Sequence, residues 1–318
     1  MMGAMRPETE ASVCGRWDAM PPSARSRWLC AALRRWVRPR WAESPDAASL
    51  RSTVAALDRC FGWPRPRCDI EVADAAGTPA LSVVARGVSP ERTVLYLHGG
   101  GFTFHLPRSY TRFAALLSRQ LDARVLVPEY RLAPEHPFPA APEDCFAVYR
   151  WLLDAGVEPA RLAVAGDSAG GNLTLATLLE AKRHGLPQPA AAWVLSPGVD
   201  FDWSTTDFAA LEPHDPMFTR AAMDLMDPYV GVADRRDPRL SPIHGDLVEL
   251  APLLLDCGEY EVLRDHAPRF AAAVRRCGGM AVDRTWPGMP HVFQLMPLLP
   301  EARASLRLGT AFLRAHME

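Results

Sequence analysis

Ser168 lies in the pattern Gly-x-Ser-x-Gly, in which a serine hydroxyl can act as a nucleophile. Residues 163–172 read AVAGDSAGGN, so an apolar run ends in GDSAG and a stretch that favours helix follows. A strand, a tight turn and a helix in this order would lift the hydroxyl clear of the sheet, at the positive end of the helix. Such a turn strains the backbone of Ser168 and leaves no room for side chains at Gly166 and Gly170. The pattern alone is weak, because glycine and serine are common in loops.

A serine nucleophile needs a histidine base within hydrogen-bond distance. In parallel sheets the catalytic side chains lie on loops beyond the carboxyl ends of the strands, and here the base is expected after the last strand. His291 meets this condition, because it follows the strand-like run 280–286 in the sequence WPGMPH. His266 also follows a strand-like run, but it lies inside a helical pattern. Position therefore favours His291.

A carboxylate must orient the base, and the order serine, acid, histidine places it after the strand-like run 253–257. The next loop, 258–265, reads GEYEVLRD. Glu261 is the preferred candidate, since the helical pattern begins soon after it. Glu259, nearer the end of the strand, is the alternative. Asp265 falls in the expected first helical turn, where a carboxylate is favoured for another reason.

A glycine-rich segment offers donors for the oxyanion that forms when serine attacks a carbonyl. Residues 98–102 read HGGGF and directly follow an apolar run. Three glycines in a row could form a flexible turn, but directly after an apolar strand they favour a place where bare backbone approaches the substrate. We expect the N–H groups of Gly99 and Gly100 to serve as donors, with that of Ala169 as the third. One such donor contributes roughly 3–4 kcal/mol of transition-state stabilisation.

These candidate residues require a sheet to position them, and the apolar patterns predict one. Strand-like runs cover 70–72, 81–85, 93–97, 124–128, 162–165, 191–195, 253–257 and 280–286. Helical patterns cover 109–121, 142–153, 169–184, 263–277 and 300–316. The alternation predicts an α/β fold, a mostly parallel sheet with helices on both faces. The first strands have no helix between them, so the sheet should begin antiparallel.

Composition limits the partners that this chain is expected to have. The chain has 318 residues with a net charge of −2, and this charge does not favour a nucleic-acid partner. Its first apolar stretch is interrupted by arginines, and no run is long enough to span a bilayer. The seven cysteines include no Cys-x-x-Cys pair, so we expect reduced thiols and no metal site. We therefore expect a soluble, cytoplasmic protein with no membrane partner.

Several motifs in one order resemble the bacterial hormone-sensitive-lipase-like carboxylesterases, the family IV or GDSAG type of the α/β-hydrolase fold. The matching segments are HGGGF (98–102), YRLAPEHPFPAAPED (130–144), GDSAGG (166–171), LSPGVD (195–200), DPM (215–217), RLSPI (239–243), GEYEVLRD (258–265) and GMPHVF (288–293). They run from the third expected strand almost to the C-terminus. So many matches in this order are specific.

The resemblance implies a catalytic triad of Ser168, Glu261 and His291, acting on carboxylic esters with short-to-medium acyl chains. It implies an eight-stranded α/β-hydrolase sheet, no cofactor and a small-molecule ester as the substrate. It also allows a homodimer formed through the edge of the sheet. The family's acid is commonly an aspartate followed by proline, whereas here Glu261 is followed by Val262.

The resemblance further implies a helical cap built from two separate segments. Residues 1–60 would form its first part and 200–247 an insertion, with a helical signal over 219–229; the catalytic core would comprise 61–199 and 248–318. We interpret the tryptophans of the first segment as anchors of the cap helices. Phe102 and Phe104, next to the oxyanion donors, are expected to line the acyl pocket.

The leading hypothesis is a serine carboxylesterase that works through an acyl-enzyme intermediate. The same chemistry would also serve a deacetylase, lactonase or amidase acting on a larger metabolite, because fold does not fix substrate. A non-catalytic small-molecule receptor on the same scaffold is the contrasting hypothesis. Receptors that resemble this family lack the histidine, whereas this chain has both Ser168 and His291.

Overall fold

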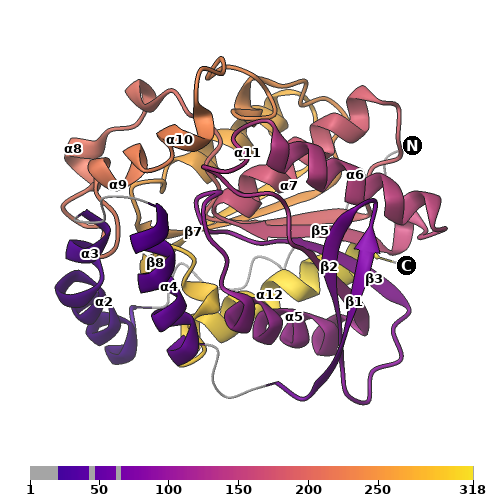
Figure 1. Cartoon of the computed structure of the whole chain (residues 1–318), viewed down its shortest axis with the longest axis horizontal. Coiled ribbons are helices and arrows are strands. Elements are labelled where there is room, and N and C mark those ends of the chain that lie inside the picture. Colours follow the sequence, from indigo (N-terminus) through magenta and orange to yellow (C-terminus); the bar gives the residue numbers. More distant parts are fainter. Residues whose placement is uncertain (1–20, 43–46, 62–65, 318) are drawn as a thin grey trace.

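An eight-stranded sheet forms the centre of the protein (Figure 1). The computed structural model describes residues 21–42, 47–61 and 66–317. The strands are β1 (Cys68–Ala75), β2 (Thr78–Ala85), β3 (Arg92–Leu97), β4 (Ala123–Pro128), β5 (Leu162–Asp167), β6 (Ala191–Leu195), β7 (Leu253–Tyr260) and β8 (Ala281–Pro290). Their order is β1-β2-β4-β3-β5-β6-β7-β8. Strand β2 pairs antiparallel with both β1 and β4, and the pairs from β4 onward are parallel. The predicted α/β fold and its antiparallel start are both confirmed.

Helices cover both faces of the sheet (Figure 1). On one face lie α6 (Ala140–Asp154), α7 (Ala169–Arg183) and α11 (His266–Arg276); on the other lie α5 (Pro107–Leu121) and α12 (Pro300–His316). Residues of β3 alternate between the two layers. Val94 and Tyr96 belong to the core beneath α5 and α12, while Leu95 and Leu97 belong to the core shared with α6 and α7. Both faces of the central strands are buried, which explains why these strands read as continuous apolar runs.

The remaining helices lie together at one end of the sheet, at the left in Figure 1. They are α2 (Ala24–Trp36), α3 (Arg38–Ala42) and α4 (Ala47–Phe61) near the N-terminus, and α8 (Phe208–Leu211), α9 (Arg220–Asp224) and α10 (Asp227–Val230) in the insertion. Short 3-10 turns complete the elements: η1 (Pro159–Arg161), η2 (Trp203–Thr205), η3 (Pro242–His244) and η4 (Phe293–Leu295). The two groups meet where α3 packs against α9. We call α2–α4 together with residues 200–247 the cap.

The helical signal over 219–229 corresponds to two short helices rather than one. Helix α9 ends at Asp224, and α10 begins at Asp227 with Pro228 as its second residue. A proline in the middle of a helix lacks a donor and its ring collides with the carbonyl four residues earlier, here that of Asp224. The proline therefore divides the segment.

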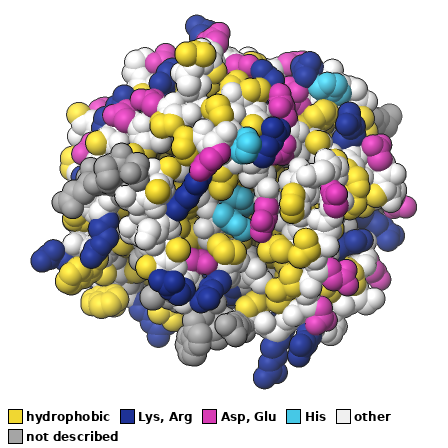
Figure 2. All heavy atoms as spheres, viewed as in Figure 1, with side chains coloured by type: hydrophobic (Ala, Val, Ile, Leu, Met, Phe, Trp, Pro, Cys, Tyr) yellow, Lys and Arg dark blue, Asp and Glu magenta, His cyan; other side chains and the backbone are white. Residues whose placement is uncertain are grey.

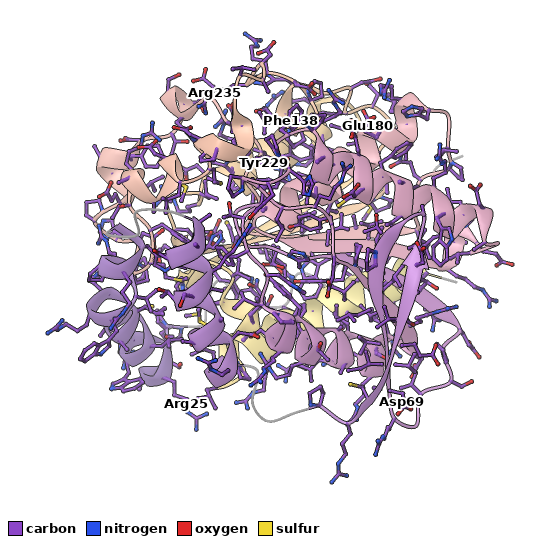
Figure 3. All side chains as sticks on the ribbon, viewed as in Figure 1. Arg25, Asp69, Phe138, Glu180, Tyr229 and Arg235 are labelled. Atoms are coloured by element: carbon purple, nitrogen blue, oxygen red, sulfur yellow. The ribbon has the colours of Figure 1, made fainter. Side chains whose placement is uncertain are left out.

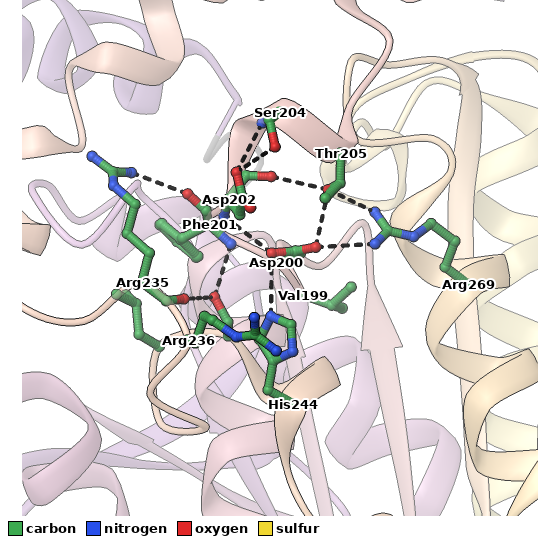
Figure 4. Close-up of polar contacts among 12 residues, drawn as sticks. Val199, Asp200, Phe201, Asp202, Ser204, Thr205, Arg235, Arg236, His244 and Arg269 are labelled. Atoms are coloured by element: carbon green, nitrogen blue, oxygen red, sulfur yellow. Dashed lines mark hydrogen bonds and ion pairs between the residues drawn. The ribbon is translucent and has the colours of Figure 1, made fainter.

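A buried carboxylate ties the insertion to the core (Figure 4). Asp200 is 1% exposed. Its Oδ2 accepts hydrogen bonds from Arg269 on α11, at 3.0 Å, and from Thr205 Oγ1, at 2.9 Å. Its Oδ1 accepts the backbone N–H of Asp202 at 3.0 Å, and His244 Nε2 lies 3.7 Å away. The start of the insertion is thus fixed by a charge-assisted bond to a helix of the sheet layer.

Two of the tryptophans of the N-terminal segment differ from the expectation that they anchor the cap. Trp28 and Trp36 are 74% and 57% exposed, whereas Trp41 is 9% exposed. Trp17 lies outside the described residues. The pattern of α2 accounts for this result, since Ser26, Cys30 and Leu33 form its buried face and the two exposed tryptophans lie on the rest of its surface. None of the helices in the described ranges is long and apolar enough to cross a membrane.

Candidate active site

Ser168 occupies a sharp turn between β5, which ends at Asp167, and α7, which begins at Ala169. Its backbone angles are φ 54° and ψ −117°, a conformation that costs a non-glycine residue energy and recurs at functional sites. A Cβ atom on Gly166 would collide with the carbonyl of Gly170, and one on Gly170 would collide with the carbonyl of Leu97. The strain at Ser168 and the need for both glycines are therefore confirmed.

The turn brings Ser168 together with residues from the ends of β7 and β8. Ser168 Oγ lies 2.9 Å from His291 Nε2, and His291 Nδ1 lies 2.7 Å from Glu261 Oε2. His291 is 5% exposed and Glu261 is 1% exposed. Because a carboxylate only accepts hydrogen bonds, it fixes the histidine proton on Nδ1 and leaves Nε2 free to accept the serine proton. The three residues chosen from sequence order meet in one hydrogen-bonded chain.

The structure separates Glu261 and His291 from the alternatives. Glu259 accepts the backbone N–H of Gly288 at 2.7 Å, and Asp265 pairs with the neighbouring Arg264. His266 is buried, and its Nδ1 accepts the backbone N–H of Val199 at 3.0 Å. Burial lowers the pKa of His266 to about 4, so this ring is neutral and structural.

Ser196, at the end of β6, supports the triad and was not singled out from the sequence. Its hydroxyl donates to Glu261 Oε1 at 2.8 Å and accepts the backbone N–H of Val292 at 3.2 Å. The N–H of Gly258 also donates to Glu261 Oε1. Glu261 therefore has partners on both of its oxygens. The LSPG motif contained this serine, but nothing in its spacing indicates contact with a loop more than sixty residues away.

Asp215 is a second supporting residue that the sequence reasoning missed. It lies in the cap and is 0% exposed. Its Oδ1 accepts the N–H groups of Met217 and Phe218, at 2.7 and 2.9 Å, and its Oδ2 accepts that of Val262, at 2.8 Å. Burial raises the pKa of Asp215 to about 6, while the three backbone hydrogen bonds oppose this rise. One carboxylate thus joins the cap to the loop that carries Glu261.

Neighbouring carboxylates set the basicity of His291. Burial alone would lower the pKa of the imidazole, but the charge and hydrogen bond of Glu261 outweigh it, and Asp215 and Asp167 add to their effect. The net result is a pKa above the ordinary value of 6.5. A base with a raised pKa holds more tightly the proton that it takes from serine.

Gly99 differs from the expectation that its N–H faces the substrate. This N–H donates to Asp167 Oδ1 at 3.1 Å. The same carboxylate accepts the hydroxyls of Tyr96, at 2.7 Å, and Tyr110, at 3.0 Å. Burial raises the pKa of Asp167 to about 6, although these three hydrogen bonds oppose it. The N–H of Gly99 therefore holds the glycine loop to the serine turn, and this assignment is corrected.

Gly100, Gly101 and Ala169 line the cavity beside Ser168. Gly100 has φ +121° and Gly101 has φ +55°, values that L side chains rarely adopt, which explains the run of glycines. The loop rests on the segment 130–144, where Tyr130 Oη donates to the carbonyl of His98 at 2.7 Å. Gly101 was not among the site residues expected from the sequence, although it is the third glycine of the triplet.

The cavity above Ser168 has a volume of about 180 Å³, and side chains of the cap form much of its wall. Phe102 and Phe104 both line it, as expected. Phe102 is stacked on Tyr229 with ring centroids 3.8 Å apart, and Tyr229 also packs against Phe138 (Figure 3). The described residues that line the cavity include no lysine, arginine or glutamate.

An aromatic bridge closes the cavity over the triad. Trp41 of α3 contacts Phe104 on the glycine loop, with ring centroids 5.6 Å apart, and Phe218 of the insertion, at 5.4 Å. Phe218 in turn meets the ring of His291 edge-on at 5.0 Å. Trp41 therefore joins both parts of the cap above the catalytic side chains. Within the described ranges no group of three or more His, Cys, Asp or Glu side chains could hold a metal ion.

Comparisons with known proteins agree with this fold. A family model for the alpha/beta hydrolase fold matches residues 94–295. An acetyl-hydrolase of Streptomyces hygroscopicus is 40% identical over 225 residues, covering 70% of this chain and 75% of that protein. The carboxylesterase/phospholipase LipF of Mycobacterium tuberculosis is 32% identical, covering 94% and 85%.

Solved structures of esterases resemble this chain over almost its whole length. An esterase from the bacterial hormone-sensitive lipase family superposes with a TM-score of 0.85 at 33% identity, covering 94% of this chain and 100% of that one. EstE5 superposes with a TM-score of 0.86 at 34% identity, covering 93% and 99%. The chain therefore belongs to the α/β-hydrolase family, as a carboxylic ester hydrolase of the bacterial hormone-sensitive lipase group.

Proposed function

We propose that this esterase hydrolyses uncharged esters with short-to-medium acyl chains through an acyl-enzyme intermediate on Ser168. The observation that carries the proposal is the hydrogen-bonded chain from Ser168 Oγ through His291 to Glu261, with distances of 2.9 and 2.7 Å. This arrangement has the nucleophile, base and orienting acid that acyl transfer requires.

In the first half of the reaction, Ser168 Oγ attacks the ester carbonyl carbon while His291 Nε2 takes the hydroxyl proton. The carbonyl oxygen becomes an oxyanion, and we assign the N–H groups of Gly100, Gly101 and Ala169 as its donors. As the tetrahedral intermediate collapses, the C–O bond to the alcohol breaks and His291 gives its proton to the leaving oxygen. The acyl group stays on Ser168.

In the second half, a water molecule replaces the alcohol. His291 Nε2 takes a proton from the water, whose oxygen forms a bond to the acyl carbon. Collapse of the second intermediate breaks the bond to Ser168 Oγ, which recovers its proton from His291. Throughout, Glu261 stabilises the positive charge on the imidazolium and keeps the ring in place, and it stays ionised.

The lining of the cavity supports uncharged substrates. No lysine or arginine among its described residues would pair with an anionic substrate, and burying an unpaired charge is costly. Removal of an acetyl group from a larger metabolite is a second candidate function. It is favoured by the Streptomyces relative, whose name is acetyl-hydrolase.

The proposed mechanism is tested by replacing the nucleophile. We expect Ser168→Ala to reduce turnover of p-nitrophenyl butyrate by about 10⁴-fold or more, and to abolish covalent labelling by a fluorophosphonate. EstE5 has been solved in a form with PMSF, a reagent of related reactivity. Ser204→Ala, at an exposed serine of the cap, is the matched control and should label as the wild type does. Full turnover by the Ser168 variant, or labelling at another serine, would contradict the mechanism.

A chain-length series distinguishes the two substrate classes. p-Nitrophenyl esters from acetate to decanoate should show a maximum in kcat/KM at short-to-medium length, because a cavity of about 180 Å³ limits the acyl chain that can be buried. A panel of acetylated metabolites measured beside them tests the deacetylase. If decanoate were the best substrate, the proposed acyl range would be wrong.

A further inference from the structure

Helix α2 has a second apolar face that the fold does not use. Its buried face includes Cys30 and Leu33, and Leu33 lines the ester cavity. On the outer half of the helix, Trp28 is 74% exposed and Trp36 is 57% exposed. Tryptophan is among the largest apolar side chains, so two of them exposed eight residues apart on one helix form a surface that favours a partner.

The charged side chains of α2 and of the residues on either side of it are all basic. Residues 21–42 contain six arginines and no aspartate or glutamate, although the whole chain has a net charge of −2. Arg38 pairs with Glu212 of the insertion at 3.5 Å. By contrast, the ion pairs of the described residues include none for Arg25, Arg27 or the two arginines at 34 and 35.

These arginines contact backbone or aromatic groups. Arg25 donates to the carbonyl of Leu298 at 3.2 Å, and Leu298 is itself 74% exposed. Arg34 donates to the carbonyl of His214 at 2.8 Å, and the guanidinium of Arg35 lies 4.9 Å from the centre of the Trp36 ring. The side chain of Arg25 extends away from the body of the protein (Figure 3).

We call the surface formed by Trp28, Trp36, Leu298, Arg25, Arg27, Arg34 and Arg35 the α2 patch. Figure 2 shows hydrophobic and basic side chains together at the lower left, where Figure 1 places α2. Some other arginines of the described surface, such as Arg51, Arg131 and Arg275, are paired with carboxylates. The α2 patch is distinguished by its combination of exposed tryptophans and an exposed leucine with several arginines on one short helix and the loop beside it.

We propose that the α2 patch docks onto an anionic phospholipid surface. Arginine is attracted to the negative headgroups, and tryptophan rings are favoured at the boundary between headgroups and acyl chains. A short helix with both features lies in the plane of a membrane and does not cross it. The sequence was expected to have no membrane partner because it has no run of apolar residues long enough to span a bilayer. The lack of a spanning segment says nothing about binding to the surface of a membrane.

The position of α2 gives the docking a consequence for the enzyme. The helix has Leu33 in the wall of the ester cavity and Trp28 on its outer side. Val37, next to its last residue, also lines the cavity. A membrane bound at the outer face therefore lies against the wall of the cavity, so esters dissolved in lipid would reach the cap at a high local concentration.

Vesicle co-sedimentation of the full chain tests the proposal. The probes are vesicles of phosphatidylcholine alone and of phosphatidylcholine mixed with phosphatidylglycerol, at low and high salt. We expect binding to the anionic vesicles at low salt, weakened about tenfold or more by high salt or by removal of phosphatidylglycerol. The variants Trp28→Ala/Trp36→Ala and Arg25→Gln/Arg35→Gln should each lose about tenfold in vesicle affinity. The control Ile70→Ala/Val72→Ala removes another exposed apolar pair, on β1, and should bind as the wild type does.

Turnover of p-nitrophenyl butyrate, a water-soluble ester, shows whether the variants are folded. Neither exposed tryptophan lines the cavity, so this activity should be unchanged. Absence of binding to anionic vesicles, or equal binding by the tryptophan variant, would overturn the proposal. So would light scattering that shows a dimer for the wild type and a monomer for the tryptophan variant, because the patch would then bind a second copy of the chain. Failure of the proposed acyl-enzyme mechanism would leave the vesicle result unaffected.

Discussion

The core and the cap build the active site by different physical means. In the core, each triad residue follows a strand end and is held by hydrogen bonds to backbone or buried side chains, as Ser196 and Gly258 hold Glu261. In the cap, the groups that line the cavity are mainly apolar side chains, some of them on short helices such as α3 and α9, with five residues each. Directional bonds fix the positions of reacting atoms, whereas apolar packing fixes only shape and size. We therefore expect the chemistry to depend mainly on the core, and the size of the substrate that fits to depend mainly on the cap.

The core extends its hydrogen bonding beneath the triad. Asp256 on β7 is fully buried and binds Arg284 on β8 through both oxygens, at 2.6 and 2.7 Å. The same carboxylate accepts the indole N–H groups of Trp193, at 2.8 Å, and Trp286, at 3.1 Å. Because β7 and β8 lead to Glu261 and His291, this cluster fixes the two strands that position the acid and the base.

The largest effect should come from the orienting acid of the core. We expect Glu261→Gln to lower kcat for p-nitrophenyl butyrate by about 10⁴-fold, because an amide in this place favours the wrong histidine tautomer. The fold should be preserved, as measured by circular dichroism. Glu259→Gln is the matched control, since its side-chain carbonyl can still accept the N–H of Gly288, and it should retain activity. A larger loss at position 259 than at 261 would reverse the assignment of the acid.

The second effect concerns stability. Asp256→Ala leaves the guanidinium of Arg284 buried without its partner, so the free energy of unfolding should fall by about 3–5 kcal/mol. Urea denaturation measures this change. Asp265→Ala, which removes an exposed carboxylate paired with Arg264, should change it by at most about 1 kcal/mol. Similar losses in both variants would show that burial of the Asp256 cluster does not matter.

The sequence predicted the core more completely than the cap. The core strands were predictable because burial on both faces makes them apolar runs, and their order then placed Ser168, Glu261 and His291. The direction of a backbone N–H is not encoded by residue type, so the role of Gly99 was wrong. Asp215 was missed because its partner Val262 lies in a distant segment. In the cap, the number of tryptophans suggested that they are buried. Only the order of residues along α2 shows which of its side chains face the protein and which face solvent.

In the cap we expect smaller and more selective effects. Trp41→Ala removes the bridge between Phe104 and Phe218 and opens the cavity. The KM for p-nitrophenyl butyrate should rise about tenfold with little change in kcat, the scale of a lost apolar contact in a pocket. For esters with longer acyl chains, kcat/KM should fall less than it does for the butyrate, or should rise. Trp36→Ala, on the outer side of the same segment, is the control and should match the wild type. A fall in kcat alone would show that the cap contributes to the chemistry itself.

The smallest effect lies where the two regions meet, at Asp215. The pKa of His291 is raised above 6.5 by Glu261 first and by Asp215 to a lesser degree, and the reaction needs the neutral imidazole. Activity therefore falls as the pH drops through this raised pKa. Asp215→Asn removes a nearby negative charge, which lowers the pKa of His291 and moves the acid limb of the pH–kcat/KM profile to lower pH.

The same substitution also separates charge from structure. Asp215 has a pKa of about 6, so its charge is present at neutral pH and is lost below that value. Asp227→Asn, at an exposed cap carboxylate paired with Arg235, should leave the acid limb in place. If Asp215→Asn lowered kcat/KM equally at every pH, the carboxylate would act only by holding Val262 and the Glu261 loop. A shift of the acid limb toward lower pH would show that a residue of the cap also raises the pKa of His291. The cap would then contribute to the chemistry through one charge, in addition to shaping the cavity.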